Sequence, residues 1–168
     1  MKKIYVIFAI ILCTLLLTAC TQPSEPVITI EATVAPLTDE QYAQVGATDD
    51  LPDPRQEHFS MFTFHFEMEH EDNIAARTIE MYSFENLKAT FQSIDDIDRY
   101  WTGSWSSQDN TNEHFATYDQ HFVFYTKDLT KEAIQQALSN EMITVSWVDE
   151  NEEKVTKEYT LAELVEFK

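Results

Sequence analysis

The chain has 168 residues, and its 30 acidic residues against 11 basic ones give a net charge of −19. Such a negative charge excludes a surface built to bind nucleic acid, because cations must meet the phosphates there. The length suits a single domain, and two glycines placed as Gly46 and Gly103 exclude a phosphate-binding glycine loop.

The N-terminus begins with the basic pair Lys2 and Lys3, followed by an uncharged and mostly apolar run over 4–19. A helix that spans a bilayer needs roughly 20 apolar residues, so this run is short for a membrane span. A basic start, an apolar middle and a small-residue end are typical of a secretory signal peptide. The sequence therefore predicts a signal peptide over 1–19, with an uncleaved membrane anchor as the alternative.

The run ends in Leu17-Thr18-Ala19-Cys20, which resembles the lipobox of bacterial lipoproteins. The resemblance implies that Cys20 carries a covalent lipid, such as palmitate, and becomes the new N-terminus after cleavage. It also implies an address on the extracytoplasmic face of a bacterial membrane, with the membrane as a partner through the lipid anchor. Cys13 lies in the removed segment, so no disulfide and no thiol chemistry are expected in the folded part.

Residues 20–57 are expected to form the lipidated cysteine and a disordered acidic tether, since they hold all five prolines of the chain. A flexible chain of about 35 residues spans roughly 30–35 Å on average. The β-branched stretch 27–34 leaves an alternative open, in which it adds a strand to the domain. The remainder, 58–168, is expected to be a single β-rich domain.

The first expected strand covers 62–69, where apolar and polar residues alternate strictly. This period of two is typical of a half-buried strand. A second expected strand over 77–84 would form a hairpin with it. Between Ser83 and Trp101 a helix capped by Ser83 is favoured over a short strand followed by a short helix. Gly103 then predicts a bend or a positive φ, before a polar loop over 106–113.

The C-terminal half has clearer secondary-structure patterns. A strand is expected within 114–126, and Thr130 is a good N-cap for a helix that ends at Ser139-Asn140. Strands over 142–148 and 154–160 predict a hairpin around the acidic turn 149–153. The pattern Thr160-Leu161-Ala162-Glu163 matches a capping box, which predicts a short final helix.

Together these elements predict a mainly β fold. The favoured arrangement is a small antiparallel β-sandwich of immunoglobulin-like type, with short extra helices. The helix at about 130–139 would cross from one sheet to the other. The alternative is an α+β sheet with helices on one face.

A metal site is one hypothesis for the polar face of the first strand. His65, Glu67 and Glu69 share that face, and residues two apart on a strand lie roughly 6.5–7 Å apart. With His121 or His114 from a neighbouring strand, they could converge on a divalent metal. An ordinary solvated strand face explains the same residues, and the H-E-x-x-H pattern is absent.

An aromatic platform is the second hypothesis. Tyr100, Trp101 and Trp105 beside Asp109 would suit a sugar or a peptide, although core packing explains aromatic residues equally well. For nucleophilic catalysis the chain shows no G-x-S-x-G pattern, and its serines at 104, 106 and 107 have no recognisable base near them in sequence.

The sequence therefore predicts an extracytoplasmic, lipid-anchored binding or interaction module. Its partner would be a protein or a small ligand and not nucleic acid, with no cofactor beyond the lipid on Cys20 and no enzymatic activity. The alternatives are a metal-handling lipoprotein that uses His65, Glu67 and a partner histidine, and a surface enzyme whose site is assembled from scattered residues. The ligand and the oligomeric state are not predicted.

The lipid anchor gives the first testable prediction. Cells that express the chain are expected to incorporate radiolabelled palmitate into it, and Cys20→Ala should abolish the label because the acylated thiol is gone. Cys13→Ala should leave the mature, labelled product unchanged. Label that survives in the Cys20→Ala variant would refute the anchor.

Overall fold

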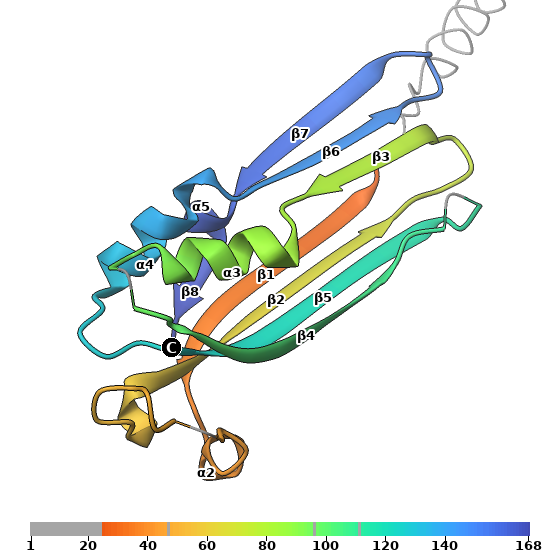
Figure 1. Cartoon of the computed structure of the whole chain (residues 1–168). Coiled ribbons are helices and arrows are strands. Elements are labelled where there is room, and N and C mark those ends of the chain that lie inside the picture. Colours follow the sequence, from red (N-terminus) through yellow and green to blue (C-terminus); the bar gives the residue numbers. More distant parts are fainter. Residues whose placement is uncertain (1–24, 47, 96, 111) are drawn as a thin grey trace, which may run out of the picture.

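The computed structural model describes residues 25–46, 48–95, 97–110 and 112–168, with only the backbone described for Tyr100 and Trp101. In this part the chain is mainly β, with two sheets and a few short helices (Figure 1). The predicted leader over 1–19 and the predicted lipid site at Cys20 lie outside the described residues. No helix within the described ranges is long and apolar enough to cross a membrane.

The larger sheet has five strands in the order β4-β5-β2-β1-β8. All neighbours are antiparallel except β1 and β8, which run parallel. Its strands are β1 (Val27–Pro36), β2 (Phe59–Glu69), β4 (Tyr100–Gln108), β5 (Phe115–Tyr125) and β8 (Val165–Phe167). The alternation predicted for the first strand is confirmed, because Phe62, Phe64, Phe66 and Met68 of β2 are all buried.

The smaller sheet has three strands in the order β3-β6-β7, namely β3 (Ala75–Met81), β6 (Met142–Val148) and β7 (Lys154–Thr160). The predicted hairpin over 142–160 is confirmed with the expected strand ends. Asp149 organises its turn, since one side-chain oxygen accepts hydrogen bonds from the backbone N–H groups of Asn151 and Glu153, both at 2.9 Å.

The helices are short: α2 (Asp39–Tyr42), α3 (Phe84–Gln92), α4 (Lys131–Ala137), α5 (Leu161–Leu164) and the 3-10 turns η1 (Gln56–His58) and η2 (Leu138–Asn140). Two predicted caps are confirmed, because Ser83 and Thr130 accept backbone hydrogen bonds at the starts of α3 and α4. The capping box at Thr160 is wrong. Its hydroxyl lies 3.3 Å from the Met142 sulfur instead, and α5 passes directly into β8.

One main core lies between the large sheet and a cover made of the small sheet and the helices α3, α4 and α5 (Figure 1). Val145 and Trp147 of β6, with Leu87 and Phe91 of α3, are buried with the β2 row in one cluster. The helix α4 links β5 of the large sheet to β6 of the small one, as predicted for a crossover helix. The fold is therefore sandwich-like and mainly β.

The prediction of a disordered tether over 20–57 is wrong for the described part of that segment. From Val27 the chain forms β1, which pairs along its whole length with β2 and also with β8. Ala32 and Val34 of β1 are buried in the main core, and Leu37 packs with Phe59 in a second, smaller cluster. The β-branched stretch thus outweighs the prolines, because Pro36 stands only at the end of the strand. The folded domain begins well before residue 58.

The expected hairpin between the first two strands is also wrong. Both edges of β2 are occupied, by β1 and by β5, so β3 has no free edge to pair with there. Instead β3 pairs with β6 in the small sheet. The loop between β2 and β3 therefore carries the chain from one sheet to the other.

Gly103 has a different role from the bend that the sequence suggested. It lies within β4, which continues through Gln108 into the expected polar loop, and its φ is not positive. A Cβ at this position would lie 2.2 Å from the Phe122 Cβ and 2.6 Å from the His121 carbonyl oxygen. The glycine is needed because β4 and β5 approach one another closely here.

Replacing Gly103 by alanine should therefore destabilise the fold by about 1–3 kcal/mol, since the added methyl group overpacks a strand pair. Urea denaturation measures this change in the free energy of unfolding. Gly46→Ala is the matched control, because nothing lies within 4 Å of a Cβ at that position. Equal stability of the two variants would contradict the close-approach explanation.

Candidate functional site

His65 stands on the face of the large sheet that points away from the small sheet. Its register partners are Glu31 on β1 and Asp119 on β5. Its Nδ1 lies 2.8 Å from an Asp119 oxygen, and its Nε2 lies 3.9 Å from an oxygen of Glu67. The hydrogen bond to Asp119, and then the charges of the surrounding carboxylates, raise the pKa of His65 above its ordinary value.

The other predicted metal ligands are arranged less favourably. Glu69 is at the end of β2, and the Nε2 of His121 lies 3.0 Å from the hydroxyl of Ser104. His114 is paired with Asp72 at 2.9 Å. Among the residues that the structure describes, no group of three or more His, Cys, Asp or Glu is placed to hold a metal ion. The geometry favours an exposed His–Asp pair at His65, and the metal site stays a prediction.

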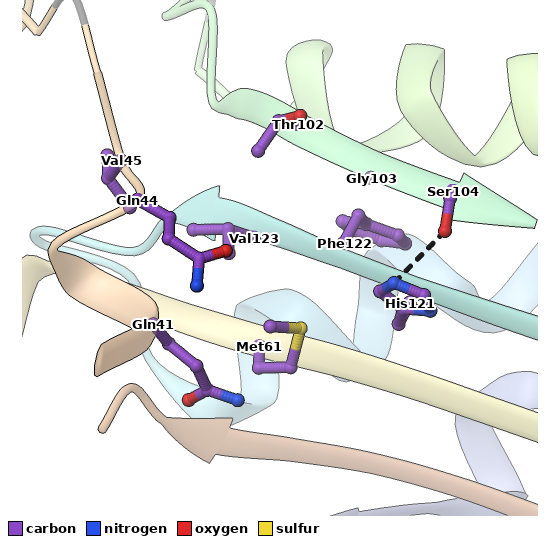
Figure 2. Close-up of a pocket in the computed structure, with 10 residues that line it drawn as sticks. All are labelled: Gln41, Gln44, Val45, Met61, Thr102, Gly103, Ser104, His121, Phe122 and Val123. Carbon is purple, nitrogen blue, oxygen red and sulfur yellow. Dashed lines mark hydrogen bonds between the residues drawn. The ribbon is translucent and has the colours of Figure 1, made fainter. Parts of the chain in front are cut away.

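The same outward face of the large sheet carries a pocket of about 280 Å³ near α2, with a mixed polar and apolar lining (Figure 2). Its lining combines side chains of α2 and the following loop with those of β2, β4 and β5: Gln41, Gln44, Val45, Met61, Thr102, Gly103, Ser104, His121, Phe122 and Val123. Ser104 and His121 face each other across β4 and β5, and a hydrogen bond joins them.

This Ser–His pair was missed by the sequence analysis because only strand register brings the two residues together. A nucleophilic serine also needs its histidine to be oriented by a third group, such as a carboxylate. Asp119, two residues along β5 from His121, is engaged by His65 instead. The pair is therefore a cross-strand hydrogen bond in the wall of this pocket.

A second cavity lies at the open side of the sandwich, and we call it the side pocket. It is bounded by β3 and the start of α3 on one side and by β4 and β5 on the other, and its volume is about 450 Å³. Because β3 and β4 are edge strands of their sheets, the cover ends there and leaves the hollow open. Its lining is Ile79, Met81, Tyr82, Ser83, Phe84, Glu85, Trp105, Tyr118 and Gln120.

Two buried polar atoms in the side pocket have no hydrogen-bond partner among the described residues: the Tyr82 hydroxyl and the Gln120 Oε1 atom. Each residue is only 7% exposed. Such an atom costs roughly 1–3 kcal/mol when it stays unsatisfied. Burial, and then the charge of Glu141, raise the pKa of Tyr82, so this hydroxyl remains neutral at physiological pH.

The predicted aromatic platform contributes to this pocket through Trp105, which stands opposite Gln120 in the β4–β5 register and is 61% exposed. Asp109 has a different role. It accepts hydrogen bonds from Arg77 at 2.5 Å and from the Tyr118 hydroxyl at 2.7 Å, so it fixes the Tyr118 ring in the wall of the pocket. The side chains of Tyr100 and Trp101 are outside the described part, so the complete platform stays a prediction.

Tyr82, Phe84 and Gln120 were not predicted as site residues. One signal was present in the sequence, because Gln120 falls on the same strand parity as the buried Phe122 and Phe124. A polar residue in an apolar row often marks a special position. Tyr82 and Phe84 gave no such signal, since strand and helix ends commonly carry aromatic residues.

The His65–Asp119 pair gives a prediction with a defined sign. Because the pKa of His65 is raised in the folded state, the pair stabilises the fold fully below the ordinary histidine pKa of about 6.5, and its contribution is lost as pH rises through the folded value. Asp119→Asn should lower the pKa of His65 in an NMR titration. The variant's loss in free energy of unfolding should also shrink above about pH 6.5.

Asp49→Asn removes an exposed carboxylate from a loop and serves as the control for that experiment. It should leave the titration of His65 unchanged. A pKa of His65 that is the same in the wild type and in Asp119→Asn would contradict the pairing.

Comparisons with known proteins give no match for this chain. No protein-family model matches the chain. A search of curated proteins finds no significant match, and a search of solved structures finds none. The function is therefore inferred from the chemistry of the site itself.

Proposed function

We propose that the protein is an extracytoplasmic, lipid-anchored binding module that holds a small ligand in the side pocket. The observation that carries the proposal is the pair of buried, unpartnered polar atoms, on Tyr82 and Gln120, in residues that line a mostly apolar hollow. A core position filled by an apolar residue would avoid this cost. A ligand that offers matching polar groups would recover it.

The composition of the side pocket supports binding of a small molecule. Sites for such ligands are concave and mostly apolar, with few polar groups that fix orientation, and they span about 300–1,000 Å³. The side pocket, at about 450 Å³, lies within this range. Its apolar residues Ile79 and Met81 and its exposed Trp105 would supply contact area, while Gln120 and Tyr82 would orient the ligand.

The anchor rests on the lipobox resemblance at Cys20. Six residues, 21–26, separate this cysteine from the start of β1. Fully extended, six residues reach only about 20–22 Å, so a lipid on Cys20 would hold the domain close to the membrane surface. We also keep the finer fold assignment, a sandwich of immunoglobulin-like type, as a prediction.

The proposal is tested by a ligand-detected NMR screen of small aromatic and polar fragments, followed by titration on the labelled protein. We expect binding fragments to shift the Trp105 indole N–H and the Gln120 side-chain amide signals. Trp105→Ala should weaken their binding by roughly tenfold or more, which corresponds to about 1.4 kcal/mol of lost contact free energy.

Val27→Ala is the control, because Val27 is also exposed and apolar but lies on β1, away from the side pocket. It should leave fragment affinity unchanged. The proposal fails if no fragment shifts either signal, or if the fragments that bind do so equally well to Trp105→Ala.

A further inference from the structure

Most of the aromatic rings that line the side pocket are held in position by contacts with core rings. Four lining residues are aromatic: Tyr82, Phe84, Trp105 and Tyr118. Core rings hold three of them by edge contacts, with centroid distances of 5.5 Å for Tyr82 on Phe64, 6.1 Å for Phe84 on Phe122 and 5.8 Å for Tyr118 on Phe66. A ligand would therefore meet rings that are already ordered, which reduces the entropy lost on binding.

The lining contains a negatively charged side chain and no positively charged one among its described residues. Aromatic faces carry partial negative charge, and the Gln120 Oε1 atom is a hydrogen-bond acceptor without a partner. Glu85 adds a carboxylate at the exposed start of α3. No lysine, arginine or histidine is among the described lining residues, and Lys88, one helical turn beyond Glu85, is not part of the lining.

A second carboxylate acts on the pocket from behind its wall. Glu141 is buried, accepts a hydrogen bond from the Thr90 hydroxyl at 2.5 Å, and influences the Tyr82 hydroxyl electrostatically. The nearby guanidinium of Arg77 is neutralised by Asp109. With a net charge of −19 over the whole chain, the long-range field also attracts cations and repels anions.

We infer that the ligand of the side pocket is an organic ammonium ion. This inference rests on the proposed function and names its ligand class. A cation near the face of an aromatic ring gains about 0.5–1 kcal/mol when exposed and about 2 kcal/mol when desolvated, and aromatic groups are widely used to bind quaternary ammonium ions. The Gln120 oxygen is buried in the structure, and a turn of its side chain toward the pocket would let it accept a hydrogen bond from an ammonium N–H or lie against a quaternary ion.

Other ligand classes fit this lining less well. A carboxylate or phosphate would place a negative charge beside Glu85, with no cationic side chain among the described lining residues to compensate it. A purely apolar ligand would leave the Gln120 oxygen and the Tyr82 hydroxyl unpartnered. A sugar would need more hydrogen-bonding groups than the few that this mostly apolar lining supplies.

The test uses two matched pairs of probes that differ chiefly in charge. Choline is compared with 3,3-dimethyl-1-butanol, its neutral isostere, and benzylamine is compared with benzyl alcohol. Affinities are measured by calorimetry and by the shift of the Trp105 indole signal at neutral pH and low salt. We expect the cation of each pair to bind at least tenfold more tightly, and benzoate to show no binding.

Variants of the full chain assign the effect to residues. Trp105→Ala should lower the affinity for both cations by tenfold or more, whereas Trp105→Phe should retain most of it. Glu85→Gln should weaken cation binding severalfold and reduce its salt dependence. Glu132→Gln on α4 removes an exposed carboxylate outside the pocket lining and should change neither.

The outcomes separate this inference from the proposed function. If the neutral probes bind as tightly as the cations and both are lost in Trp105→Ala, the side pocket binds ligands but the ammonium assignment is wrong. If neither cation shifts the Trp105 signal, the ammonium assignment is also wrong. The fragment screen then decides independently whether the pocket binds anything at all.

Discussion

The row of apolar side chains on β2 is the constraint on which the rest of the structure depends. Residues 21–168 contain no cysteine, so the domain must be stabilised by its core alone. The row is buried only if strands flank β2 on both sides and a second layer covers it. β1 and β5 provide the first condition, and the small sheet with α3 and α4 provides the second. The segment expected to be a tether is therefore part of the sheet.

The side pocket follows from a mismatch between the two layers. The large sheet has five strands and the small sheet three, so the cover does not reach over the whole inner face. At the β8 edge, α5 lies against the end of β1 and contributes Leu161 to the core. At the β4 edge α3 contacts β4, but Trp105 on that strand remains exposed on the inner face. The candidate site thus lies where the sandwich is left open.

A buried charged residue stabilises the C-terminal end of β5. Arg99, which is almost fully buried, forms a two-pronged ion pair with Asp95 and donates hydrogen bonds to the backbone carbonyls of Tyr125 and Lys127. Hydrogen bonding by Arg99 lowers the pKa of Asp95. The guanidinium thereby satisfies carbonyl groups where β5 ends and fixes the connection from α3 to β4. Arg77 has a comparable role at the opposite end of β5, through Asp109 and the Asn110 carbonyl.

Local features were predictable from the sequence because their causes lie within a few residues. The alternation on β2, the caps at Ser83 and Thr130 and the hairpin of β6 and β7 all depend on neighbours in the chain. Strand partners depend on which edges remain free, which the sequence does not state. The expected hairpin between β2 and β3 failed for that reason, and the Ser104–His121 pair was missed for the same reason.

The position of Gln120 in the core could be predicted from the sequence, but its lack of a hydrogen-bond partner could not. Its parity places it in a row with Phe122 and Phe124, so a polar group in the core could be noticed from the alternation alone. The sequence could not show whether that group is paired, since its possible partners come from strands far apart in the chain. In the structure its oxygen is buried and unpartnered, and the residue belongs to the lining of the hollow beside Trp105. An apolar side chain would pack at this position at less cost, and the proposed ligand is what would give the polar group a partner.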